Sequence, residues 1–124
     1  MSETKLYLAL AASLGAAGVL LLAAGSHAAP GNVTLAGQML LFHAPTLMAA
    51  VLARDAGLLH GLVGRVAIIG LAAGVIVLGA DLALRGFGHG RLFPMAAPIG
   101  GTLMIAGWFV LAASAALAPG RGRG

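Results

Sequence analysis

The chain has 124 residues, of which 60% are hydrophobic and 8% are charged, with a mean hydropathy of +1.04. Ordinary soluble domains carry about 25% charged residues, so this composition excludes that class of protein. The sequence has no cysteine, which excludes disulfides, iron–sulfur clusters and thiol catalysis. Its net charge of +4 is scattered over loops and ends, so we expect no nucleic acid among its partners.

Four nearly unbroken apolar stretches predict the fold. They cover about residues 6–25, 36–53, 62–84 and 96–118. Each has roughly the 17–25 residues that a helix needs to cross a bilayer. Because the connections are short, consecutive helices should be antiparallel neighbours. The sequence therefore predicts an all-α, integral membrane four-helix up-down bundle with short loops, a single membrane domain over residues 1–124 whose first partner is the lipid bilayer.

The first stretch has two interpretations. Lys5, the apolar run and the small-x-small sequence Ser26-His27-Ala28 are typical of a secretory signal peptide. However, the run is longer than a usual signal core, so we expect it to form the first membrane span, ending near His27. The cluster Ala29-Pro30-Gly31-Asn32 predicts a turn after it.

The second stretch contains a histidine and a proline close together. Pro45 lacks an N–H, so the carbonyl of Leu41 loses its helical partner and the helix should bend. We interpret His43, with Thr46 nearby on the same face, as a group that ties this helix to a neighbour. Such side chains can compensate for a break in a membrane helix.

The third stretch carries the one acidic residue inside any span, Asp81. Arg85 follows four positions later on the same face, which predicts an intrahelical ion pair, with the arginine reaching toward the interface. A proton-relay or ligand-binding carboxylate is the alternative. Gly70 and Gly74 predict close helix packing, either within the bundle, which we favour, or at a dimer face.

The fourth stretch opens with a proline and two glycines. Proline is tolerated in a first helical turn, where its missing N–H has no partner to lose. We expect Pro98, Gly100, Gly101 and Gly107 to allow close packing, and Trp108 to be a packing group rather than a cofactor contact.

Polar side chains of three predicted spans and one loop gather toward one end of the bundle, which makes that end the default site. They are His27, His43, Asp81, Arg85 and His89. Zinc would accept such ligands, but no two histidines or acids here have the i, i+3 or i, i+4 spacing that marks a site. Only His43 is clearly intramembrane, which does not fit bis-histidine haem. We therefore expect no metal and no cofactor.

Basic residues predict the orientation. One side of the membrane would carry Lys5, Arg54, Arg65, Arg121 and Arg123, against Arg85 and Arg91 on the other. Positive charge favours the cytoplasm, so both termini should be cytoplasmic. Abundant arginine, alanine and glycine are typical of a GC-rich bacterial genome, which predicts a multi-pass protein of the bacterial inner (plasma) membrane.

Several landmarks together resemble one family. They are Ala24-Gly25-Ser26-His27, Phe42-His43, Gly79, Pro98-x-Gly100-Gly101 and Ala106-Gly107-Trp108. This set is similar to the small bacterial YgdD-type membrane proteins, a family of unknown function that includes vertebrate transmembrane protein 256. The resemblance covers about residues 5–118 and is strongest from Pro98 to Trp108. It implies a four-helix inner-membrane protein without an established enzymatic activity.

The chain departs from that family in two places. The family usually has small, hydroxyl and aromatic residues after the glycine of the third helix, whereas Ala80-Asp81-Leu82 follows Gly79 here. Pro45 is also unlike the family pattern. The resemblance therefore implies no role for Asp81.

Three functions stay open at this point. The first is a non-catalytic accessory or structural subunit that packs against a larger membrane complex or against itself. The second is a small carrier or channel-like module for protons, ions or a quinone-like molecule, using His43 and Asp81. The third is a metal- or haem-binding membrane protein. No nucleophile–base pair, phosphate loop or carboxylate pair occurs in the sequence, so we expect no enzymatic activity.

Overall fold

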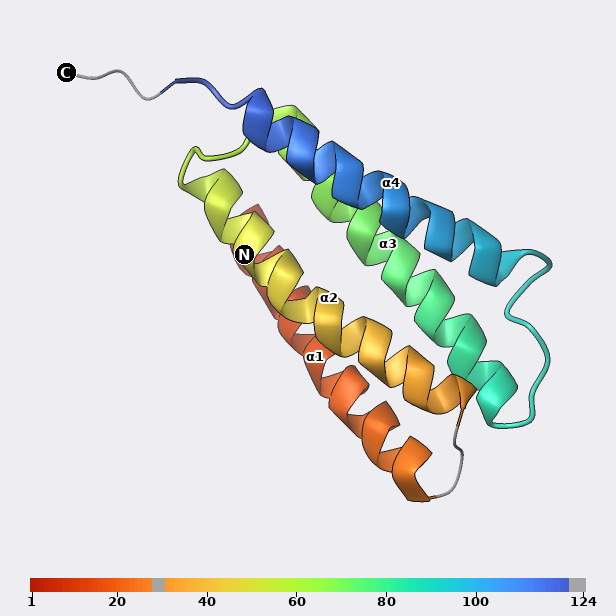
Figure 1. The fold of residues 1–124 in the computed structure, drawn as a ribbon. Coiled ribbons are helices and arrows are strands. Elements are labelled where there is room, and N and C mark those ends of the chain that lie inside the picture. The colour runs from red at the N-terminus through yellow and green to blue at the C-terminus, as the bar shows by residue number, and fades with distance from the viewer. Residues whose placement is uncertain (28–30, 121–124) are drawn as a thin grey trace.

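A computed structural model describes residues 1–27 and 31–120, and helices make up most of them (Figure 1). The helices are α1 (Glu3–His27), α2 (Asn32–Asp55), α3 (Gly61–Gly86) and α4 (Ala96–Ala116). All four are long and apolar enough to cross a membrane. The predicted all-α, multi-pass membrane fold is thus confirmed.

The helix ends differ slightly from the predicted spans. The first three helices extend beyond the apolar stretches into flanking polar residues, since a helix can continue past the hydrocarbon layer. Helix α4 instead ends at Ala116, before the predicted limit of residue 118. Helix α2 continues through Pro45. Residues 28–30 of the predicted first turn, and Arg121 and Arg123, lie outside the described residues.

The helices pack in chain order. Helix α1 packs on α2, α2 on α3 and α3 on α4, as the short connections predict. Figure 1 shows α1 beginning and α4 ending near the α2–α3 loop, with the end of α1, the start of α2 and the α3–α4 loop at the opposite end. Within residues 1–27 and 31–120, no comparable packing joins α1 to α4. The bundle therefore has two outer helices, α1 and α4, on a central α2–α3 pair.

The core lies between the two central helices. Its most deeply buried large side chains include Ile68, Leu71 and Val75 of α3 and Leu47 and Val51 of α2. Many apolar side chains of α1 and α4 are exposed instead, for example Leu20 and Phe109. In a bilayer this apolar surface faces lipid tails, so its exposure has no hydrophobic cost.

Glycines bring the backbones of paired helices close together. A Cβ atom at Gly74 of α3 would lie 2.8 Å from the carbonyl oxygen of Gly100 on α4, and one at Gly107 would lie 2.8 Å from Leu71 Cγ. Gly18 and Gly37 make the equivalent contact between α1 and α2. Three of the predicted packing glycines therefore allow close contact between α3 and α4 within the bundle: Gly74, Gly100 and Gly107.

The other two predicted packing glycines leave room for a side chain, although Gly70 also lies against the backbone of α4. A Cβ at Gly70 would meet its nearest neighbour only at ordinary van der Waals distance, 3.9 Å from Gly107 Cα. A Cβ at Gly101 would meet nothing within 4 Å. Adjacent glycines on a helix point about 100° apart, so Gly100 and Gly101 cannot both face α3.

Candidate functional site

A histidine of α2 and a tryptophan of α4 are joined by a hydrogen bond. Trp108 Nε1 donates to His43 Nε2 at 3.2 Å, and His43 Nδ1 lies 2.7 Å from the carbonyl oxygen of Met39. Because indole N–H is only a donor and a carbonyl is only an acceptor, the ring is neutral with its proton on Nδ1. The imidazole is 7% exposed, and the indole meets it edge-on with centroids 5.8 Å apart.

This bond is the tie between helices that the sequence predicts for His43. The sequence did not identify Trp108 as the partner of His43, because it predicted only a packing role for Trp108. Thr46 does not share the role, since its hydroxyl donates to the carbonyl of Phe42 in its own helix at 3.1 Å. The Nε2 atom of His43 connects α2 to α4, whereas its Nδ1 atom contacts a carbonyl of α2 itself.

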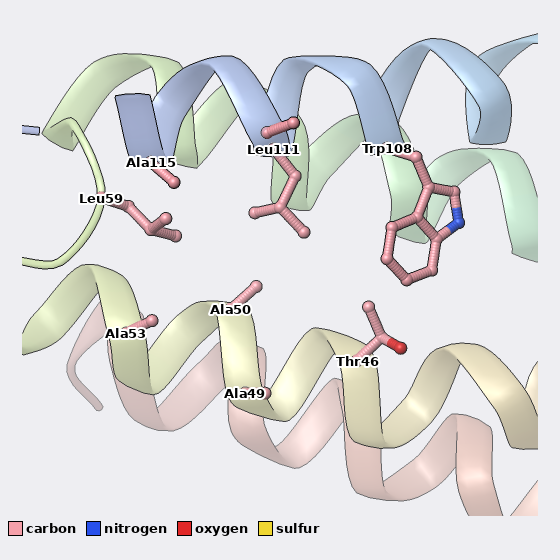
Figure 2. Close-up of a pocket in the computed structure, with 9 residues that line it drawn as sticks. Thr46, Ala49, Ala50, Ala53, Leu59, Trp108, Leu111 and Ala115 are labelled. Atoms are coloured by element: carbon pink, nitrogen blue, oxygen red, sulfur yellow. The ribbon is translucent and has the colours of Figure 1, made fainter. Parts of the chain in front are cut away.

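An apolar groove begins beside Trp108 and runs between α2 and α4. Its volume is about 490 Å³, and small side chains dominate its walls. Figure 2 shows Ala50 and Ala53 of α2 facing Leu111 and Ala115 of α4, with Leu59 of the α2–α3 loop at the far end. The groove therefore separates α4 from α2 along this stretch, and the bond between Trp108 and His43 joins the two helices beside it.

Asp81 and Arg85 form the predicted ion pair near the end of α3. Asp81 Oδ2 lies 2.8 Å from Arg85 Nη2, and the carboxylate side chain is 1% exposed. Its other oxygen, Oδ1, accepts a hydrogen bond from the backbone N–H of Leu92 at 2.9 Å. Asp81 therefore also anchors the α3–α4 loop, a role that its position in the sequence does not indicate.

A second, smaller cavity adjoins this pair. Its volume is about 270 Å³, and it is lined by two arginines, one aspartate and the first turn of α4: Asp81, Arg85, Arg91, Ala96, Ala97 and Pro98. Unlike the α2–α4 groove, this cavity has charged walls, and it lies at the end of the bundle where α3 meets α4.

The structure does not gather the five predicted polar residues into one site. His43 is bound to Trp108, Asp81 is bound to Arg85, and His27 and His89 are exposed at the end of α1 and in the α3–α4 loop. No group of three or more His, Asp or Glu side chains that could hold a metal occurs among the described residues. The predicted cluster therefore contains one pair, Asp81 with Arg85, while His43 bonds to Trp108, which lies outside the predicted cluster.

At the other end of the bundle, Glu3 connects three helices. Its Oε1 lies 3.0 Å from Arg65 Nε on α3 and 3.4 Å from Arg54 Nη1 on α2. Beside it, the hydroxyl of Thr4 donates to Asp55 Oδ1 at 3.2 Å. From the sequence, Arg54 and Arg65 were used only to predict the orientation and Glu3 was missed, although an acid at the start of a chain with few acids and several basic helix ends is a usable signal.

A further polar link holds α4 to the α2–α3 loop. The backbone N–H of His60 donates to the carbonyl of Ser114 at 2.9 Å, and the hydroxyl of Ser114 donates to the carbonyl of His60 at 3.3 Å. The His60 ring caps α3 by accepting from the N–H of Val63 at 3.3 Å. Ser114 is completely buried, and its two hydrogen bonds with His60 hold the end of α4 against the α2–α3 loop.

Comparisons with protein-family models, with curated proteins and with solved structures find no match to this chain. The resemblance to the YgdD-type family therefore stays a prediction, whereas the four helices are long and apolar enough to cross a membrane.

Proposed function

We propose that this protein is a small, non-catalytic integral membrane subunit that packs against a transmembrane helix of a larger membrane complex. The α2–α4 groove is the observation that carries this proposal. Five of its nine lining residues are alanines: Ala49, Ala50, Ala53, Ala112 and Ala115. In lipid, helices associate where small side chains let backbones approach, so an alanine-lined groove suits an incoming helix.

The polar interior supports a structural role. His43, Asp81 and Ser114 are the buried polar side chains of the described residues, and each contacts a partner within the chain. These contacts connect α2 to α4, α3 to its following loop, and α4 to the α2–α3 loop. These contacts fix the positions of α2 and α4, whose side chains line the groove. A structural use of the buried polar groups is consistent with a non-catalytic subunit.

A carrier for protons, ions or a quinone-like molecule has less support. It would require His43 to exchange protons or ligands, whereas both of its ring nitrogens are occupied by internal contacts. Association with a second copy of this chain is the closer alternative, since the same groove could receive a helix from either source.

Because the sequence has no cysteine, a single introduced cysteine can report on the groove in native membranes. We would attach a photo-cross-linker to Ala112→Cys, which lines the groove, and to Ala113→Cys as the matched control. Residue 113 is also exposed but does not line the groove. The proposal predicts a discrete cross-linked product with a second protein at position 112 and none at 113.

Two results would contradict the proposal. Equal labelling at both positions, or none at either, would mean that the groove does not receive a specific helix. A product of exactly twice the mass of this chain would replace the larger complex with a homo-oligomer. Native mass spectrometry in a mild detergent provides an independent readout, because a chain that is monomeric and isolated there has no packing partner.

A further inference from the structure

The charged cavity at the α3–α4 end contains polar atoms without hydrogen-bond partners. Asp81 Oδ2 and Arg85 Nε are both buried, and neither has a hydrogen-bond partner among the described residues, although Oδ2 lies in ion-pair contact with Arg85 Nη2. Both side chains line the cavity. Because buried polar atoms are normally hydrogen-bonded, this cavity suits an occupant that both accepts and donates.

The charge of the lining residues indicates which charge an occupant of the cavity should carry. Arg85 and Arg91 contribute two positive charges and Asp81 one negative charge, which leaves +1 at the cavity. Arg91 comes from the exposed loop, so its guanidinium can reach a group at the mouth. Guanidinium groups bind phosphate oxygens strongly through charge-assisted hydrogen bonds. A phosphodiester with a charge of −1 would balance this cavity.

An apolar groove continues from the charged cavity along α4. It has a volume of about 350 Å³ and is lined by Met95, Pro98, Ile99, Thr102 and Leu103. Pro98 lines both spaces, which makes them neighbours. The Thr102 hydroxyl donates to the carbonyl of Pro98 at 2.7 Å, so it does not require a ligand. An amphiphilic molecule would fit these two spaces, with its polar group in the charged cavity and its apolar chain in the groove along α4.

We propose that this end of the protein binds a glycerophospholipid. The phosphate accepts hydrogen bonds from Arg85 Nε and the Arg91 guanidinium. A hydroxyl or ammonium group of the headgroup donates to Asp81 Oδ2, and one acyl chain lies in the groove between Met95 and Leu103. The site is separate from the α2–α4 groove, so it does not depend on the function proposed above.

The test is native mass spectrometry of the purified full chain, titrated in detergent with phosphatidylglycerol, phosphatidylethanolamine, phosphatidylcholine or inorganic phosphate. The first two lipids carry a headgroup donor, whereas the trimethylammonium of phosphatidylcholine has no N–H. We expect one retained molecule of either donor-bearing lipid, and about tenfold weaker retention of phosphatidylcholine, the effect of one lost hydrogen bond to a charged group. Inorganic phosphate should not compete at equal concentration.

Two variants separate the cavity from general attraction to charge. Arg91→Gln removes a phosphate ligand, and Ala97→Leu fills the cavity without changing any charge. Both should weaken retention by about tenfold or more, whereas Lys5→Gln, which removes one positive charge at the opposite end, should not. Helical content by circular dichroism checks that each variant is folded. Unchanged lipid retention by Ala97→Leu, equal binding of all three lipids, or equal competition by inorganic phosphate would overturn the proposal.

Discussion

Trp108 on α4 and His43 on α2 are 65 positions apart in sequence, and they meet through a 3.2 Å hydrogen bond across the α2–α4 groove. The bond has the indole N–H as donor and the imidazole Nε2 as acceptor, while Nδ1 faces the carbonyl of Met39. A protonated ring would place an N–H against the indole N–H. The contact between the helices therefore requires a neutral His43.

Replacing Trp108 with phenylalanine should destabilise the fold by about 0.5–2 kcal/mol. The aromatic ring is kept, but His43 Nε2 is left without its donor. The free energy of unfolding can be measured by denaturation in mixed micelles. Phe109→Leu is the control, because Phe109 is 73% exposed and next to Trp108. In a His43→Phe, Trp108→Phe double variant, much of the loss should be recovered, because no buried acceptor remains. A single variant as stable as the parent chain would contradict this account.

The helices themselves are predictable because the bilayer imposes their length. An apolar stretch of about 20 residues must be helical in lipid to satisfy its backbone, whatever its side chains. Contacts within one helix are predictable as well, since positions four apart share a face. The Asp81–Arg85 pair follows from that spacing alone.

The faces that helices turn to one another could not be predicted in this way. In a soluble helix a polar stripe shows which side faces outward, but these helices are apolar all round. The sequence therefore places His43, Asp81 and His27 at approximate depths without giving their directions. The pairing of Trp108 with His43 depends on those directions and appears only in the structure.

Asp81→Asn should destabilise the α3–α4 end by about 1–3 kcal/mol, because it leaves Arg85 without its counter-charge. The value lies below that of a fully buried pair, since the Arg85 side chain is 31% exposed and can move toward water. The asparagine can still accept from the N–H of Leu92. Asp81→Ala removes that bond too, and should be less stable than Asp81→Asn. Hydrogen exchange of the α3–α4 loop measures this difference, and equal exchange in both variants would exclude the anchoring role.

Glu3→Gln should weaken the attachment of α1 by less than about 1 kcal/mol, because its partners are partly exposed to solvent. The effect should decrease at high salt, which screens such pairs. Lys5→Gln is the matched control, since it removes a charge two positions away without removing the acid that joins Arg54 and Arg65. Proteolysis of α1 at low and high salt reports the difference. A loss that is independent of salt would mean that Glu3 acts through packing instead.

Gly100 and Gly101 provide the sharpest test of how α3 and α4 pack, because they are adjacent and identical in chemistry. In Gly100→Ala the new methyl group would lie 2.7 Å from the backbone nitrogen of Leu78 and 2.8 Å from the carbonyl oxygen of Gly74. Neither backbone atom can move without separating the helices, so we expect a loss of about 1–3 kcal/mol. In Gly101→Ala the methyl group meets nothing within 4 Å, and stability should stay equal or rise by up to about 1 kcal/mol, because alanine favours the helix. Thermal unfolding of both variants in the same detergent measures the contrast. If the two variants were equally stable, α3 and α4 would not be in backbone contact at Gly100.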